Sequence, residues 1–113
     1  MKTAENFREF CGINSINLSK DKDGQVGYQT KTVHSEYTHK DETYHILSGC
    51  NEDGKVLFIP SIGAWNAAEN REMKLGELTV VEGGTAKDGV TPVFFLHKPA
   101  SFAGTVNSDM LGF

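Results

Sequence analysis

The chain has 113 residues, a net charge of −4 at pH 7, 38% hydrophobic residues and 10% aromatic residues. The length is that of a single domain, and the apolar content excludes a chain that is disordered throughout. The acidic balance argues against binding duplex DNA or a membrane surface through bulk charge. The sequence has no apolar run of about 20 residues, and its start lacks the apolar segment of a signal peptide. We therefore expect a cytoplasmic protein without a membrane span.

The N-terminal segment Thr3–Phe10 is expected to form a short helix. Thr3 can cap its start, and Phe7 and Phe10, three positions apart, would share one side. Gly12 is expected to end this helix.

Two alternating stretches, Ile16–Leu18 and Val26–Thr30, are expected to pair with each other as a β-hairpin. The turn-forming segment Asp21–Gly24 separates them. The parity of the apolar positions then changes after Thr32, which predicts a β-bulge or a bend near this residue.

Thr43–Gly49 and Lys55–Ile59 are expected to form the next pair of strands. The segment Cys50–Gly54 would join them as a five-residue loop, a length that hairpins commonly use. This loop would place Ile46 opposite Phe58.

The following residues predict a second helix and a third hairpin. Ala64–Lys74 has a helical pattern, and Gly76 stands at a suitable C-terminal position. Leu78–Val81 and Val93–Leu96 are apolar, β-rich runs on either side of a polar connection that contains glycine.

Two details of this hairpin bear on binding. The segment Gly83–Gly89 lacks the Gly-Lys-Ser/Thr ending of a phosphate-binding loop and no helix follows it, so we expect a hairpin loop. Phe94 and Phe95 are adjacent and must point to opposite faces of a strand. One of them is expected in the core, and the other is either covered by a helix or the tail, or exposed to a ligand.

These elements predict a mostly-β fold: a small OB-like barrel of five to seven strands, or a sandwich, with one or two short helices. The β domain is expected to span residues 1–100. Residues 101–113 are expected to form an irregular C-terminal tail, because their pattern fits neither helix nor strand. Apolar residues such as Leu111 and Phe113 predict that this tail docks in a groove on a neighbouring copy or on a partner protein.

Metal-ligating side chains are densest in His34–His45, which holds three histidines and three carboxylates. If the chain made a two-residue turn at positions 40 and 41, His34, Glu36 and His45 would share a strand face and could ligate zinc. The alternative is a solvated hairpin with a weak His–Glu pair. We expect no bound metal, because water competes well at an exposed, charged hairpin.

Other reactive side chains form no recognisable catalytic pattern. His97 has no acidic partner at a characteristic spacing, and neither a nucleophile-elbow serine nor a metalloprotease helix motif occurs. Cys11 and Cys50 are expected to be free thiols, because disulfide frameworks usually contain more cysteines. We therefore expect a protein that is not an enzyme and has no cofactor.

The C-terminal third resembles a known family. A helix over Asn66–Lys74 leads through Leu75–Glu77 into LTVVEGG, a polar loop and VTPVFFLHKP. This order is similar to the last third of OB-fold single-stranded-DNA-binding proteins, including phage versions, in which a helix precedes the fourth strand and a flexible loop joins that strand to the fifth. The apolar end of the segment Asp109–Phe113 is also similar to such proteins. The resemblance implies an aromatic and basic barrel face that follows single strands, and a tail that recruits replication partners.

The chain is therefore predicted to be a non-catalytic, phage-like module that binds single-stranded nucleic acid by aromatic stacking and by Lys/Arg contacts to phosphates. The expected contact residues are Tyr28, Lys31, Lys87, Phe94 and Lys98. An alternative of another class is a small structural or assembly subunit that acts through protein–protein contacts, using β edges and the tail. Either protein could be a homo-oligomer.

Overall fold

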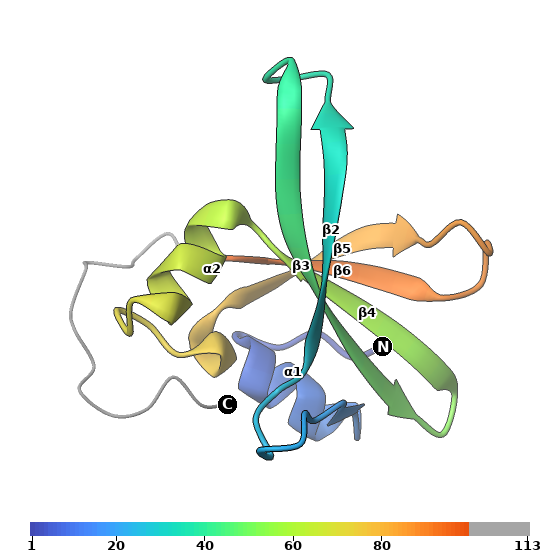
Figure 1. The fold of residues 1–113 in the computed structure, drawn as a ribbon. Helices are drawn as coiled ribbons and strands as arrows, with labels where there is room; N and C mark the ends of the chain where they lie inside the picture. The colour runs from blue at the N-terminus through green and yellow to red at the C-terminus, as the bar shows by residue number, and fades with distance from the viewer. Residues whose placement is uncertain (100–113) are drawn as a thin grey trace.

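A computed structural model describes residues 1–99 of the chain (Figure 1). These residues form six strands, two α-helices and one 3₁₀ turn. In chain order the elements are α1 (Phe7–Ile13), β1 (Asn17–Leu18), β2 (Tyr28–Ser35), β3 (Lys40–Asn51), β4 (Gly54–Pro60), α2 (Ile62–Glu69), η1 (Leu75–Glu77), β5 (Thr79–Thr85) and β6 (Pro92–His97). None of these helices has the length and the apolar content needed to cross a membrane.

The strands form one curled sheet, shaped as half of a barrel (Figure 1). Its order is β1-β3-β4-β6-β5, and β2 pairs with the same edge of β3 as β1 does. β4 and β6 are parallel, whereas the other pairs are antiparallel. Within residues 1–99 β2 and β5 do not pair, so the sheet stays open between them. The predicted class, a small mostly-β barrel-like fold with two short helices, is confirmed.

The core lies between the sheet and the two α-helices. Phe7 and Phe10 of α1 contact Phe58 of β4, with ring centroids 4.7 and 6.0 Å apart. Phe10 also lies 5.0 Å from Phe94 of β6, and Leu47 of β3 is fully buried beside them. Each large apolar side chain buried in this way stabilises the fold by roughly 1.5–3 kcal/mol.

Helix α1 begins at a different cap from the one predicted. Asn6, not Thr3, is the capping residue, and its side-chain oxygen accepts a hydrogen bond from the backbone N–H of Glu9 at 2.8 Å. Gly12 does not end the helix, which continues to Ile13. The Asn6 side chain satisfies one of the free N–H groups of the first turn, which explains why the helix starts here.

Helix α2 lies earlier in the chain than the predicted segment Ala64–Lys74. Ser61 caps it, because its hydroxyl accepts a hydrogen bond from the N–H of Ala64 at 3.1 Å. The helix ends at Glu69, and Arg71 then adopts a left-handed φ of 62°. A right-handed helix cannot continue through this conformation, so the residues that follow lie outside α2.

The hairpin predicted between the first two strands forms only at its tip, and the strands themselves do not pair with each other. β1 and β2 run in the same direction, and both pair with β3. The residues between them make a short excursion that is closed by a bridge between Lys20 and Val26. Asp21 holds the turn by accepting hydrogen bonds from the N–H groups of Asp23 and Gln25. The prediction of a turn was correct, but the long strand β3 provides the pairing partner for both flanking strands.

The register between β3 and β4 differs from the predicted one by one residue. Phe58 pairs with Leu47 and not with Ile46, because the connecting turn has two residues instead of five. Asn51 supports this turn by accepting a hydrogen bond from a backbone N–H within it, and Gly54 follows with a φ of 125°. The shift matters because a one-residue change of register exchanges the two faces of a strand.

Of the β-bulge or bend predicted near Thr32, the β-bulge does not occur. The ladder between β2 and β3 runs without a shift from Tyr28 to Ser35, whereas a register shift occurs in β5 between Glu82 and Thr85. β2 is an edge strand with both faces exposed, so its apolar positions do not have to keep a constant parity.

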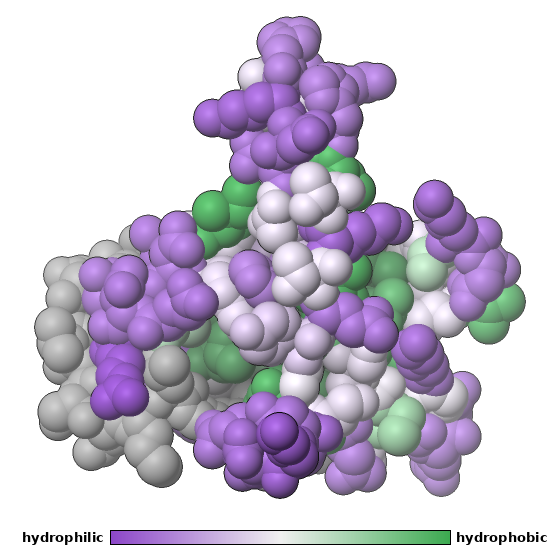
Figure 2. Space-filling model, viewed as in Figure 1, coloured by the Kyte–Doolittle hydropathy of each residue, from purple (hydrophilic) through white to green (hydrophobic). Residues whose placement is uncertain are grey.

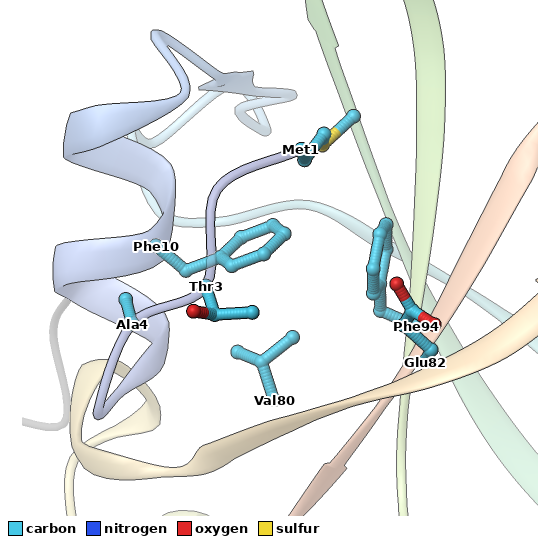
Figure 3. Close-up of a pocket in the computed structure, with 7 residues that line it drawn as sticks. All are labelled: Met1, Thr3, Ala4, Phe10, Val80, Glu82 and Phe94. Atoms are coloured by element: carbon cyan, nitrogen blue, oxygen red, sulfur yellow. The ribbon is translucent and has the colours of Figure 1, made fainter.

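The first residues of the chain lie against the core beside β5 and β6 (Figure 3). Asn14 fixes them, because its side chain accepts a hydrogen bond from the N–H of Lys2 and donates one to the Lys2 carbonyl, both at 2.9 Å. A cavity of about 40 Å³ remains between this segment, Phe10 and Phe94. Binding pockets for small molecules usually exceed about 300 Å³, so this cavity is a packing feature.

Candidate functional site

A groove of about 490 Å³ lies on the face of the sheet opposite the helices. Strands β2 to β6 all contribute to its lining. Its lining includes two lysines, two aromatic residues and two isoleucines: Lys31, Lys87, Tyr44, Phe95, Ile46 and Ile59. Figure 2 shows hydrophobic surface at the base of the β2–β3 hairpin and beside the β5–β6 hairpin, whose tips are largely hydrophilic. The groove is thus apolar in its floor and polar at its rim.

The alternation along each strand explains which side chains reach the groove. On β3, Tyr44 and Ile46 line it, whereas Leu47 on the opposite face is fully buried in the core. The register carries this division across the sheet, so Lys31 of β2 lies opposite Tyr44, and Phe95 of β6 lies opposite Ile59 of β4. Side chains from distant parts of the chain therefore converge on one surface.

Phe95 can lie on the groove face because β5 has a glycine beneath it. A Cβ atom on Gly83 would come within 2.6 Å of Phe95 Cε2, so any other residue would displace the ring. Gly84 follows with a φ of 90°, at the register shift of β5. The Phe95 ring remains 38% exposed, which leaves part of its surface free to contact a ligand.

Positive charge gathers on this face, although the chain as a whole is acidic. Four lysines lie on or beside it: Lys31, Lys40, Lys55 and Lys87. Glu42 shares this face and Asp88 lies in the adjacent loop near Lys55, whereas Asp41 and Glu82 lie on the other face. The described residues that line the groove itself thus include two lysines, Lys31 and Lys87, and no carboxylate.

The loop between β5 and β6 is organised by Asp88. Its carboxylate accepts hydrogen bonds from the Thr91 hydroxyl at 2.6 Å and from the N–H groups of Val90 and Thr91 at 2.8 Å. The Thr91 hydroxyl and then these N–H groups lower the pKa of Asp88 to about 2, and Lys55 makes a smaller contribution. The ordered loop holds Lys87 at the rim of the groove.

The loop between β2 and β3 presents an aromatic side chain. The Ser35 hydroxyl accepts hydrogen bonds from the N–H groups of Tyr37 and Thr38 at 3.2 and 3.3 Å. Tyr37 is 98% exposed. The loop at the end of the β2–β3 hairpin thus has hydrogen bonds that fix its backbone and an exposed aromatic side chain.

The residues predicted as contacts are distributed over both faces of the sheet. Lys31 and Lys87 line the groove. Tyr28 lies on the other face, where its ring is 4.7 Å from that of Trp65 in α2, and Phe94 is buried in the core. Lys98 lies beside the start of α2, with its Cε 3.7 Å from the position that a Cβ on Gly63 would take. The predicted tail contacts Leu111 and Phe113 lie outside the described residues.

The two groove aromatics Tyr44 and Phe95 were not among the predicted contacts. A sequence signal for Phe95 existed, because one of the two adjacent phenylalanines had to leave the core. Tyr44 lies three positions before the buried Leu47 and therefore on the opposite face of β3. The predicted five-residue loop paired Ile46 with Phe58, which would have placed Tyr44 on the same face as the core. Only the structure places both rings in one groove.

The histidine-rich hairpin does not have the geometry that a two-residue turn at positions 40 and 41 would have given. Ser35 pairs with Lys40, so Glu36 lies in the loop and not opposite His45. His45 instead stacks on Trp65, with ring centroids 4.2 Å apart, and His34 lies 3.3 Å from Asp41. Within residues 1–99 no three His, Cys, Asp or Glu side chains come together in a way that could hold a metal ion.

Comparisons with known proteins add no further assignment, since no protein-family model, curated protein or solved structure matches this chain.

Proposed function

We propose that the chain is a module that binds single-stranded nucleic acid, with single-stranded DNA as its ligand. The observation that carries the proposal is the groove in which Tyr44 and Phe95 meet Lys31 and Lys87. Aromatic rings and cations on one surface match the two parts of an unpaired strand, its exposed bases and its phosphates.

The chemistry of the groove favours an unpaired strand over a duplex. Stacking of a base on an aromatic side chain contributes about 1–3 kcal/mol and requires a base whose face is free. The lysines release counterions from the phosphates that they contact, which makes the affinity depend on salt. A net charge of −4 keeps attraction for duplex DNA low away from the groove.

The order of elements supports the same proposal. Counted from β2, α2 precedes the fourth strand, β5, and the loop of residues 86–91 joins it to the fifth, β6. This is the order of elements in the OB-fold proteins that the sequence resembles. Such folds bind oligonucleotides on the face of the second and third strands and with the loops after the first and fourth. Here these positions are β3, β4 and the loops that contain Tyr37 and Lys87.

The proposal is tested by fluorescence anisotropy with labelled oligo-dT and a labelled duplex of equal length, at about 50 mM and about 200 mM salt. We expect oligo-dT to bind more tightly than the duplex and to weaken as salt rises. Two phosphate contacts, at Lys31 and Lys87, would give a slope of log K against log salt of about −1.4. No binding of oligo-dT at the lower salt would refute the proposal and favour a protein-binding subunit.

Two charge-reversal variants locate the site. Lys31→Glu and Lys87→Glu should each weaken oligo-dT binding and reduce the magnitude of the salt slope by about 0.7. Lys22→Glu is the matched control, because it changes the net charge equally but lies in the exposed turn between β1 and β2, outside the groove. An equal loss in all three variants would assign the binding to bulk charge and not to the groove.

A further inference from the structure

The outer part of the β2–β3 hairpin rises from the body of the molecule as a two-stranded arm (Figure 1). Every residue of β2 from Tyr28 to His34 is exposed, and in the described part of the chain its outer edge has no pairing partner. A two-stranded ribbon alone is marginally stable in water, whereas a third strand makes it secure. The arm therefore presents an edge that gains stability from another strand.

The two open edges of the sheet differ in how they are protected. β5 contains Gly83, Gly84 and a register shift, which disrupt a regular edge. β2 has eight paired residues without a shift, and it contains no proline or glycine. Proteins usually protect exposed edges with bulges, prolines or several charges, and β2 has only Lys31. The regular edge of β2 is therefore suited to strand pairing.

We infer that β2 pairs antiparallel with β2 of a second copy of this chain, around a two-fold axis at Thr32. An axis perpendicular to the sheet keeps both grooves on the same side, which requires residues of equal parity to face each other. An axis at Lys31 would place two ammonium groups opposite each other, which is unfavourable. The axis at Thr32 instead places Lys31 opposite Val33 of the second copy.

In this register, the face of the arm that carries Thr32 and Thr43 meets the same face of the second copy, with threonine beside threonine. The hydroxyls of Thr32 and Thr43 already lie 3.0 Å apart within one chain. The two-fold axis would bring Thr32 next to Thr32 of the second copy and extend the pair to a row of four threonines. Threonine pairs directly opposite each other are favourable neighbours in antiparallel sheets.

The other face of the arm offers complementary charge. Val33 pairs with Glu42 within one chain, so Lys31 would lie two strands away from Glu42 of the second copy. Two strand spacings amount to about 10 Å, which the long side chains of lysine and glutamate can span above Val33. The two-fold axis generates this pair twice, and it joins the two grooves into one surface. The pairing stands independently of the proposed function, because it requires no nucleic acid.

The pairing is tested by size-exclusion chromatography with light scattering over a range of protein concentrations, without nucleic acid. The wild-type chain should form a dimer. Thr32→Glu and Thr32→Lys should each be monomeric, because the axis places two like charges against each other. An equimolar mixture of the two variants should recover the dimer, since position 32 of one copy faces position 32 of the other.

Thr43→Glu is the matched control, with the same substitution on the same face of the neighbouring strand. Its carboxylates would lie about three strand spacings apart, roughly 14 Å, where salt screens most of the repulsion, so the dimer should persist. Thermal unfolding checks that each variant is folded. A monomeric wild-type chain at every concentration overturns the inference, and so do dimeric Thr32 variants or a mixture that stays monomeric.

Discussion

Phe94 and Phe95 are neighbours in the sequence but lie on opposite faces of β6. Phe94 is 7% exposed and contacts Phe10 and Phe58, whereas Phe95 is 38% exposed above Gly83. The sequence predicted that one of the two leaves the core, but it could not tell which. The choice is made by α1, because Phe10 covers one face of β6, and this contact joins residues far apart in the chain.

Alanine substitutions should separate the roles of the two rings. Phe94→Ala should lower the free energy of unfolding by about 3–5 kcal/mol, because it leaves a cavity in the core. Phe95→Ala should instead weaken oligo-dT binding by about five- to 150-fold, from the loss of roughly 1–3 kcal/mol of stacking, with a smaller effect on stability. Urea unfolding and anisotropy measure the two quantities. Equal losses of stability, with binding unchanged in Phe95→Ala, would remove Phe95 from the site.

The lysines of the groove were easier to predict than its aromatic residues. Lys31 and Lys87 lie at exposed positions of a strand and a loop, where a charged side chain has no place in the core. An aromatic side chain fits a core or a binding face equally well. Tyr44 therefore needed the observed register of β3 before its face could be assigned.

At the scale of elements, loop 86–91 depends on the ionised side chain of Asp88. Its carboxylate holds the N–H groups of Val90 and Thr91 and the Thr91 hydroxyl. The pKa of Asp88, about 2, lies below its usual value of 3.8, so the ordered loop favours the ionised form. The contribution of Asp88 to loop order is fully present above about pH 4 and is lost as the pH falls toward 2.

This dependence should be visible by NMR. The amide signals of Val90 and Thr91 should shift with a midpoint near pH 2, well below that of an ordinary aspartate. In Asp88→Asn the same signals should show no titration in this range, because the amide oxygen still accepts hydrogen bonds but has no ionisable group. A midpoint near pH 4 in the wild-type chain would show that the carboxylate does not hold the loop.

The strands and helices were predictable in kind, but their partners were less so. The β5–β6 hairpin was predicted correctly, because two apolar runs flank a polar, glycine-containing loop. The pairing of β1 with β3 was missed, because a local turn signal does not show that a more distant strand provides the partner. The length of the β3–β4 turn depended on Asn51 and Gly54, which a longer loop would also accommodate. Local chemistry places the turns, whereas the choice of pairing partner for a strand depends on contacts distant in the sequence.

At the scale of the whole molecule, the two thiols report on different environments. Cys11 is buried with the core residues of α1, and this burial raises its pKa to about 12. Cys50 is exposed near the end of β3. The thiol of Cys50 is therefore accessible to reagents, whereas formation of the reactive thiolate is suppressed at Cys11 in the folded chain.

A thiol reagent at pH 8, followed by mass spectrometry, should give one adduct with the native chain and two after denaturation. Cys50→Ser should give no adduct until the chain unfolds, because Cys11 reacts only when α1 leaves the core. Rapid modification of Cys11 in this variant under native conditions would show that the helix opens separately from the rest of the fold.

The parallel pairing of β4 with β6 has a thermodynamic consequence. It brings the second half of the chain back onto the first, so the wall formed by residues 31–59 and the wall formed by residues 83–95 meet only after folding. A ligand that touches both walls is therefore bound by the native chain and not by the unfolded one. Its binding free energy adds to the stability of the protein, by about 2.7 kcal/mol at a concentration one hundred times the Kd. The parallel β4–β6 pairing thus couples occupancy of the groove to the stability of the fold.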